Sequence, residues 1–157
     1  MQKNTTSDLE KALLVAAEQN DIKPIKKLLD QKVNVNARTK DGRTALMVAA
    51  EHGRCSFMKY LIDAKADIEA EDSDGYTALT WAVSKKYAWS LITLLDNNAD
   101  IEHRNHQGMT PLSIAVYYGD ITCVKSLLCF KPNVRAKNAE ELTPLMIACA
   151  QGREAIN

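Results

Sequence analysis

The sequence has few of the residues that mark a disulfide-stabilised protein or a metal-binding module. Its 157 residues include only four cysteines, six glycines and four prolines. The cysteines form no C-x-x-C pair and no Cys/His pattern, which argues against a zinc site and a disulfide framework. We therefore interpret Cys123 and Cys149, which fall at apolar positions of expected helices, as small buried side chains.

Charge and apolar runs argue against further classes of protein. The chain carries 20 basic and 20 acidic residues, so no net field favours binding to nucleic acid or to an anionic membrane. The polar start "MQKNTTSD" lacks an apolar leader, and no apolar run approaches the length of a transmembrane helix. We expect a soluble chain without a secretory signal, located in the cytoplasm or alternatively in the nucleus.

The sequence does contain a regular internal repeat. Four threonines stand 33 residues apart, each followed by Leu two positions later and Ala five positions later. The threonines are Thr44, Thr77, Thr110 and Thr143; the leucines are Leu46, Leu79, Leu112 and Leu145; the alanines are Ala49, Ala82, Ala115 and Ala148. A weaker copy precedes them, with Leu13, Ala16, Ala17 and the pair Leu28-Leu29. A period of this length indicates stacked supersecondary units.

Each unit has the signals of two short helices joined by turns. A threonine such as Thr44 can accept hydrogen bonds from the first N–H groups of a helix, and Pro111 and Pro144 follow at the first helical position. Glycines such as Gly53 end this helix, and Asp120 is suited to the start of a second one. The repeat therefore predicts a series of helix–turn–helix units.

The repeated motif resembles that of the ankyrin-repeat family over nearly the whole chain. The resemblance is carried by "DGRTALMVAAEHG…YLIDAKADIEA" and "QGMTPLSIAVYYG…SLLCFKPNVRA". It implies an all-α solenoid of stacked helix–turn–helix units with projecting β-hairpin loops. We expect a single domain over residues 1–157, with units at about 6–38, 39–71, 72–104, 105–137 and a truncated unit at 138–157.

The chain departs from the family pattern at several positions. Met47, Thr80, Ser113 and Met146 replace the usual His after the threonine, so a bond that often links neighbouring loops should be missing or weakened. Lys32, Lys65, Asn98 and Lys131 stand where the family prefers Gly after the second helix, and each Lys should be strained if the left-handed conformation is kept. Glu141 replaces a turn Gly, so the last hairpin is expected to be distorted.

The last unit should leave part of its apolar surface uncovered. Its second helix has barely begun at Asn157, so Leu145 and Ile147 are expected to be partly exposed. We interpret the chain as a fragment of a longer multidomain protein. A naturally short chain that dimerises at this end is the alternative.

The resemblance implies binding of a protein partner, a peptide or a folded domain, in a concave groove, without catalysis and without a cofactor. We expect the domain to be monomeric. In the family, hairpin tips and the last residues of the first helix face this groove. The corresponding candidates are Lys40, Arg43, Glu51, His52, Asp74, Tyr76, Lys85, His106, Met109, Tyr117, Tyr118 and Leu142. The first half of the groove is charged, whereas aromatic residues and Met in the second half are typical contact residues of protein interfaces.

Three functions stay open at this point. The chain could be a scaffold or adaptor module, a self-contained inhibitor that covers the surface of an enzyme, or a structural spacer. A catalytic function has little support, because His103 and His106 fall in a loop without a partnering Glu or Cys nearby in the sequence. We interpret these two histidines as solvated hairpin side chains.

Two tryptophans and one asparagine need separate interpretations. Trp81 occupies a slot of Val and Ile in other units and is expected in the core, with its N–H directed at a hydrogen-bond partner or at the edge of the core. Trp89 and Ile92 fall on the back of a second helix, either as a local packing adjustment or as a second contact patch. The resemblance also suggests that Asn36 could be hydroxylated by an asparaginyl hydroxylase.

Overall fold

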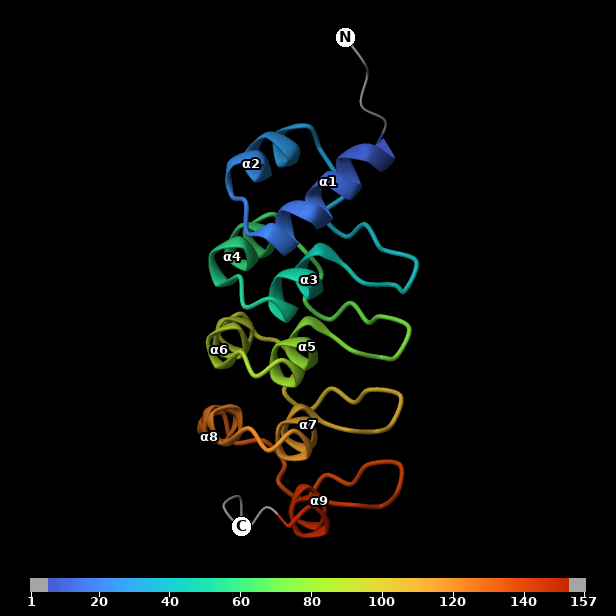
Figure 1. Cartoon of the computed structure of the whole chain (residues 1–157), viewed down its shortest axis with the longest axis vertical. Coiled ribbons are helices and arrows are strands. Elements are labelled where there is room, and N and C mark those ends of the chain that lie inside the picture. Colours follow the sequence, from blue (N-terminus) through green and yellow to red (C-terminus); the bar gives the residue numbers. More distant parts are fainter. Residues whose placement is uncertain (1–5, 153–157) are drawn as a thin grey trace.

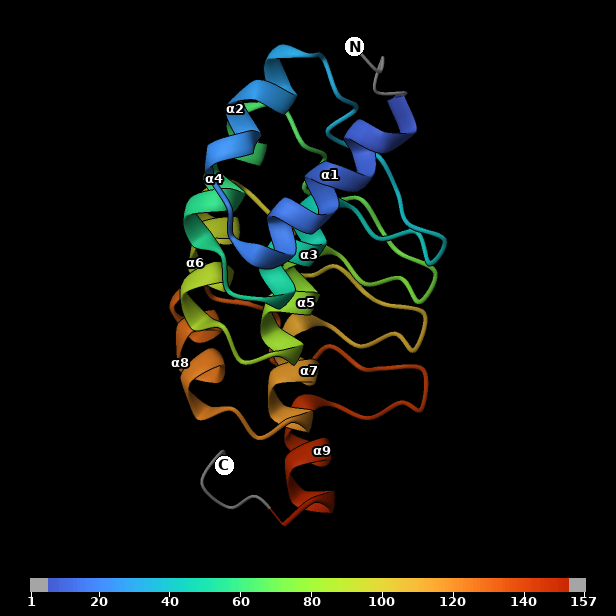
Figure 2. The same cartoon turned by 45° about the horizontal axis from the view of Figure 1, so that its top comes forward.

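The structure, a computed structural model, describes residues 6–152 as a stack of helix pairs. The helices are α1 (Thr6–Gln19), α2 (Lys23–Asp30), α3 (Ala45–Glu51), α4 (Cys55–Asp63), α5 (Ala78–Ser84), α6 (Ala88–Asp96), α7 (Pro111–Tyr117), α8 (Ile121–Cys129) and α9 (Pro144–Ala150). Figures 1 and 2 show the odd-numbered helices as one column, with the even-numbered helices on one side and the long loops on the other. The all-α repeat solenoid predicted from the sequence is therefore confirmed.

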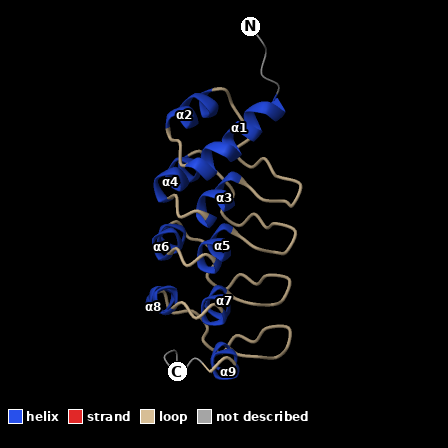
Figure 3. Ribbon diagram, in the orientation of Figure 1, coloured by secondary structure: helices blue, strands red, loops and turns tan. Residues whose placement is uncertain are grey.

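The loops that connect successive units are hairpins in path only. Within residues 6–152 they contain no strand, and one isolated bridge joins Arg38 and Thr44 (Figure 3). Backbone hydrogen bonds and side-chain hydrogen bonds together give these loops their shape. Asn105 Oδ1, for example, accepts from the N–H groups of Gln107 and Met109 at 3.0 and 2.9 Å.

The evenly spaced threonines begin the odd-numbered helices, as predicted. Thr44, Thr77, Thr110 and Thr143 have extended backbone and accept a hydrogen bond from the N–H three residues later. This bond satisfies one of the donors that the first turn of a helix leaves unpaired. Pro111 and Pro144 occupy the first helical position, where a missing N–H costs nothing.

Small residues allow the odd-numbered helices to pack closely along the stack. Ala49, Ala82 and Ala115 are fully buried, and α3, α5 and α7 each contact the next helix of this column. Leucines from both columns fill the remaining space, including Leu46, Leu61 and Leu79. Each unit thus covers the apolar face of its neighbour, as expected of a repeat protein whose single units cannot bury a core.

The residues that replace glycine after the even-numbered helices keep the left-handed conformation. The φ angles of Lys32, Lys65, Asn98 and Lys131 are 55°, 66°, 65° and 55°. Glu141 also adopts a positive φ of 62°, but its hairpin is not distorted, so that expectation was wrong. Asn138 Oδ1 accepts from the N–H groups of Glu140 and Leu142 and holds the turn without a glycine.

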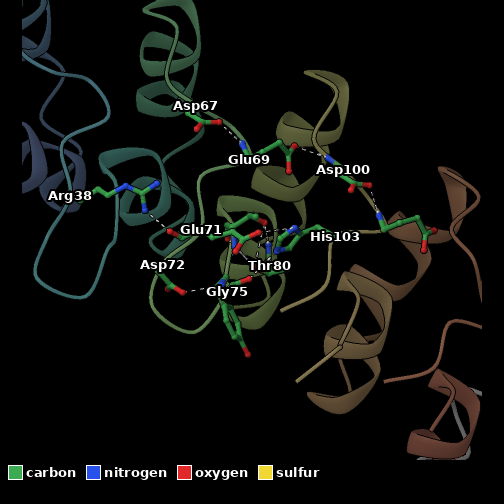
Figure 4. A network of polar contacts seen from close by, with 12 residues as sticks. Arg38, Asp67, Glu69, Glu71, Asp72, Gly75, Thr80, Asp100 and His103 are labelled. Atoms are coloured by element: carbon green, nitrogen blue, oxygen red, sulfur yellow. Dashed lines mark hydrogen bonds and ion pairs between the residues drawn. The ribbon is translucent and has the colours of Figure 1, made fainter. Parts of the chain in front are cut away.

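Neighbouring loops are linked by bonds that the sequence analysis did not anticipate. The Arg38 guanidinium donates to the carbonyl of Glu71, and Arg104 donates in the same way to Lys137 (Figure 4 shows the first). Between them, His103 Nε2 lies 2.9 Å from the Gly75 carbonyl oxygen. His103 is half-buried in this role, so its interpretation as a solvated side chain was wrong.

A second set of bonds repeats with the same 33-residue period along the edge of the stack. Glu69 Oε1 accepts from the Asp100 N–H at 2.8 Å, and Glu102 Oε1 accepts from the Asn133 N–H at 2.6 Å. Asn36 Oδ1 likewise accepts a hydrogen bond from the Asp67 N–H, at 2.8 Å. These bonds tie each unit to the next, so the loops form an ordered edge.

Burial in the last unit differs from expectation at two residues. Ile147 is buried beside α7, and only Leu145 of the expected pair is exposed. Cys123 is buried as predicted, but Cys149 is exposed, whereas Ala50, Val83 and Val116 at its register position are buried. Those three residues belong to units that have a second helix, α4, α6 or α8, whereas in residues 6–152 no second helix follows α9.

Candidate functional site

Two adjoining pockets lie between the loops and the odd-numbered helices, where the groove is predicted. We call the first the tyrosine pocket; it has a volume of about 590 Å³. Its lining residues are Tyr76, Gln107, Met109, Ile114, Tyr117, Tyr118, Asn138, Ala139, Glu140, Leu142, Ile147, Ala150 and Gln151. The second, the tryptophan pocket, has a volume of about 460 Å³. It is lined by Asp74, Tyr76, Trp81, Ser84, Lys85, Asn105, His106, Gln107 and Tyr118.

Two consecutive tyrosines at the end of α7 border the tyrosine pocket. Tyr117 and Tyr118 are 48% and 39% exposed, and their ring centroids lie 5.3 Å apart in an edge-to-face arrangement. Met109 and Ile147 form a buried apolar floor, and Leu142 is half-buried beside them. The pocket thus offers an apolar floor and aromatic walls, a combination that favours insertion of an apolar side chain.

Trp81 lies at the wall of the groove and not in the core. It is half-buried, and its Nε1–H donates to Asp72 Oδ2 at 2.8 Å, so its expected hydrogen-bond partner exists but its predicted burial was wrong. The Arg43 guanidinium lies 4.5 Å from the centroid of the Trp81 ring, and Lys85 Nζ lies 5.6 Å from it. The attraction between these cations and the aromatic ring favours a position of the Trp81 indole on the side of α5 that faces the loops.

The charged half of the groove is largely engaged within the molecule. Glu51 forms ion pairs with Arg43 and with Lys85, the latter at 3.3 Å. His52 Nδ1 lies 2.9 Å from the Val48 carbonyl oxygen, and Lys40 is exposed near the tip of its loop. Arg43, Glu51 and His52 therefore have partners within the molecule that a ligand would have to replace or share, whereas Lys40 is exposed.

Tyr76 connects the two pockets and is held in its neutral form. Its ring lies 5.3 Å from that of Trp81, and it lines both pockets. Burial raises the pKa of Tyr76, and the nearby Tyr118, Asp72 and Asp74 raise it further, against a hydrogen bond with Asn105 that lowers it. A neutral phenol keeps its O–H as a donor for a bound ligand.

The structure brings eight of the twelve candidate residues together in the two pockets. These are Asp74, Tyr76, Lys85, His106, Met109, Tyr117, Tyr118 and Leu142. Lys40, Arg43, Glu51 and His52 line neither pocket. Of the eight, Met109 is only 8% exposed and serves as floor rather than as an exposed contact.

Sequence reasoning missed two groups that shape the groove. Asp72 positions Trp81, and Asn138 brings the last hairpin against the tyrosine pocket. Both belong to a series at the repeat period, with Thr39 and Asn105 as the other members. A search for hydroxyl and amide or carboxylate side chains two positions before each turn would have found them, because such residues hydrogen-bond backbone N–H groups in turns.

The described part of the chain lacks two other kinds of site. Residues 6–152 hold no group of three or more His, Cys, Asp or Glu placed to bind a metal ion. Over the same residues, every helix is too short or too polar to cross a membrane.

The fold is a repeat solenoid whose loops and helix ends line two adjoining pockets. Comparison with family models matches the family described as ankyrin repeats (3 copies) at residues 13–105 and 90–157. The chain therefore belongs to the ankyrin-repeat family, as the sequence resemblance indicated. A comparison with curated proteins gave no match. Ankyrin repeats are generally protein–protein interaction modules and are typically not catalytic.

Proposed function

We propose that the chain is a scaffold or adaptor module that binds a protein partner through the concave groove, with the tyrosine pocket as the main contact. The observation that supports this most directly is the grouping of Tyr76, Tyr117, Tyr118 and Leu142 around a buried apolar floor. Aromatic residues at the edge of an apolar pocket contribute much of the binding energy in protein interfaces.

The order of the loops supports the same proposal. Backbone and side-chain bonds link each loop to the next, including those from Arg104 to Lys137 and from Ala139 N–H to the Gln107 carbonyl at 3.0 Å. A surface that is ordered before binding loses little conformational entropy when a partner docks. The partner would insert an apolar side chain into the tyrosine pocket and place polar groups near Lys85 and His106 in the tryptophan pocket.

The test compares proteins captured from a cell lysate by the wild-type chain and by the double variant Tyr117→Ala/Tyr118→Ala. Quantitative mass spectrometry identifies the captured proteins, and calorimetry with the purified partner measures affinity. We expect the double variant to weaken binding by about a hundredfold, which corresponds to two residues of moderate importance in an interface.

Phe130→Ala is the matched control. The exposed fraction of Phe130, 38%, is close to the 39% of Tyr118, and Phe130 lines neither pocket. Circular dichroism establishes that each variant keeps its helical content. Undiminished affinity in the folded double variant would contradict the proposed groove. The absence of any captured protein would favour a structural spacer.

A further inference from the structure

A third hollow lies on the opposite side of the stack from the loops, among the even-numbered helices. We call it the outer hollow; its volume is about 600 Å³. Its lining includes Lys59 from α4, Trp89 and Thr93 from α6, and Thr122 from α8, with Lys86 and Tyr87 just before α6. Figure 1 shows that α4, α6 and α8 lie on the side of the odd-numbered helices away from the loops. The outer hollow is therefore separate from the groove.

Trp89 is exposed to solvent, and the fold makes no use of its side chain. Its side chain is 78% exposed, the largest value among the large apolar residues of the described chain. The residues at the same register position are Lys23, Ser56 and Thr122, all polar and exposed. A local packing adjustment, one of the two interpretations offered by the sequence, therefore does not explain Trp89. Ile92, its expected companion, packs instead against the core.

Two neighbouring residues also depart from the repeat, and both border the same hollow. Lys86 has a φ of 67° at the position where Gly53 and Gly119 stand, a conformation that favours glycine. Tyr87 is 42% exposed at the position where Asp120 caps α8. Neither change improves the helix start, since Tyr87 makes no side-chain cap bond. Three departures within four residues thus converge on one exposed surface.

The charge of the outer hollow indicates the chemistry of a ligand. Lys59 and Lys86 are exposed beside Trp89, and neither has an ion-pair partner among residues 6–152. The residues that line the hollow include these two lysines and no carboxylate. A hollow lined by an exposed indole and two ammonium groups is complementary to a segment that carries an apolar side chain and carboxylates.

We propose that the outer hollow is a second binding site, which takes an acidic peptide segment of a partner protein. An apolar side chain of the segment covers the Trp89 indole, and its carboxylates lie near the ammonium groups of Lys59 and Lys86. The site is independent of the groove, so one protein could be held on each side of the stack.

The test selects a phage-displayed library of random peptides on the Tyr117→Ala/Tyr118→Ala variant, which lacks the main contacts of the groove. We expect the selected peptides to carry Asp or Glu next to an apolar residue. Calorimetry then measures the affinity of these peptides. The substitution Trp89→Ser introduces the serine that stands at the same register position in the preceding unit, Ser56, and should weaken binding about tenfold or more. Ser56→Ala and Phe130→Ala are the controls and should leave affinity unchanged.

Lys86→Gly separates binding from folding. Because glycine suits a φ of 67°, this variant should have a higher melting temperature than the wild type. It should nevertheless bind the selected peptides about twofold to fivefold more weakly, as expected for loss of one exposed charge pair. A purely structural role of Lys86 would instead change stability without changing affinity.

Several outcomes would overturn the proposal. Selected peptides that are basic, or that bind Trp89→Ser as tightly as the wild type, would do so. A second measurement uses vesicles of phosphatidylcholine and phosphatidylserine. Trp89-dependent binding to these vesicles, together with failure to select acidic peptides, would assign the surface to a membrane and not to a protein. Failure of the groove experiment alone leaves this result unaffected, because the two sites share no residue.

Discussion

The indole Nε1–H of Trp81 donates a hydrogen bond of 2.8 Å to Oδ2 of Asp72, which lies in the loop before α5. The other oxygen of this carboxylate accepts from the N–H groups of Asp74 and Tyr76 at 3.0 and 2.9 Å. One buried carboxylate therefore sets the shape of the loop and fixes the orientation of the tryptophan. This places both Trp81 and Tyr76 on the wall of the groove.

Asp72→Asn should remove the bond to Trp81 and keep the loop. Asparagine already stands at this position in two later units, where its oxygen accepts the two loop N–H groups. Its amide nitrogen cannot accept from the indole, so we expect the free energy of unfolding to fall by about 1 kcal/mol. Urea denaturation measures this change. In a Trp81→Phe background the same substitution should cost close to nothing, and an equal cost there would contradict the assigned bond.

Lys65→Gly should stabilise the domain. Lys65 is exposed and has a φ of 66°, so its side chain contributes strain and little packing. Relief of that strain, less the greater freedom of glycine in the unfolded chain, should raise the free energy of unfolding by about 1 kcal/mol. Asn98→Gly, at a φ of 65°, is the comparison and should gain less, since Asn tolerates this conformation. A melting temperature of Lys65→Gly that is equal to or below that of the wild type would refute the argument.

The features of the fold that the sequence predicted correctly are those fixed within a few residues. The hydroxyl of Thr44 accepts from an N–H in the first turn of its own helix, and Pro111 stands at the first position of the helix that it begins. Such features depend on local geometry and repeat with the period, so one clear copy predicts the others. The register of the stack could be predicted from the sequence for the same reason.

The features that the sequence did not predict depend on contacts beyond a single helix start or turn. Trp81 was assigned to the core by its register position, but Arg43 of the preceding unit stacks on its ring and Asp72 holds its N–H. His103 was taken as solvated, but it links two loops. Cys149 matches buried residues in register, but its exposure depends on whether a neighbouring helix covers it. These contacts join residues that the repeat period alone does not pair.

Tyr76 should ionise above the ordinary range of tyrosine and make the fold sensitive to alkali. Its pKa is raised in the folded protein from the ordinary value of 10.0, mainly by burial. The contribution of Tyr76 is therefore fully present below pH 10 and is lost as the pH rises through its folded pKa. Absorbance of tyrosinate should show one late-ionising group in the wild type that is missing in Tyr76→Phe. Urea midpoints above pH 10 should fall less steeply for Tyr76→Phe, whereas parallel curves would show that Tyr76 is not responsible.

Leu112 and Leu145 occupy the same register position but should respond differently to truncation. Leu112 is 3% exposed because units pack on both sides of α7, whereas Leu145 on α9 is 57% exposed. Leu112→Ala should lower the free energy of unfolding by about 3 kcal/mol, which combines lost burial with the cavity that remains. Leu145→Ala removes a side chain that is mostly in water, so its cost should stay below about 1 kcal/mol. Urea denaturation of both variants measures the difference. Equal costs would mean that the outer face of α9 is covered in solution, for instance by a second copy of the chain, and a fall in the apparent mass of Leu145→Ala by light scattering would identify that dimer.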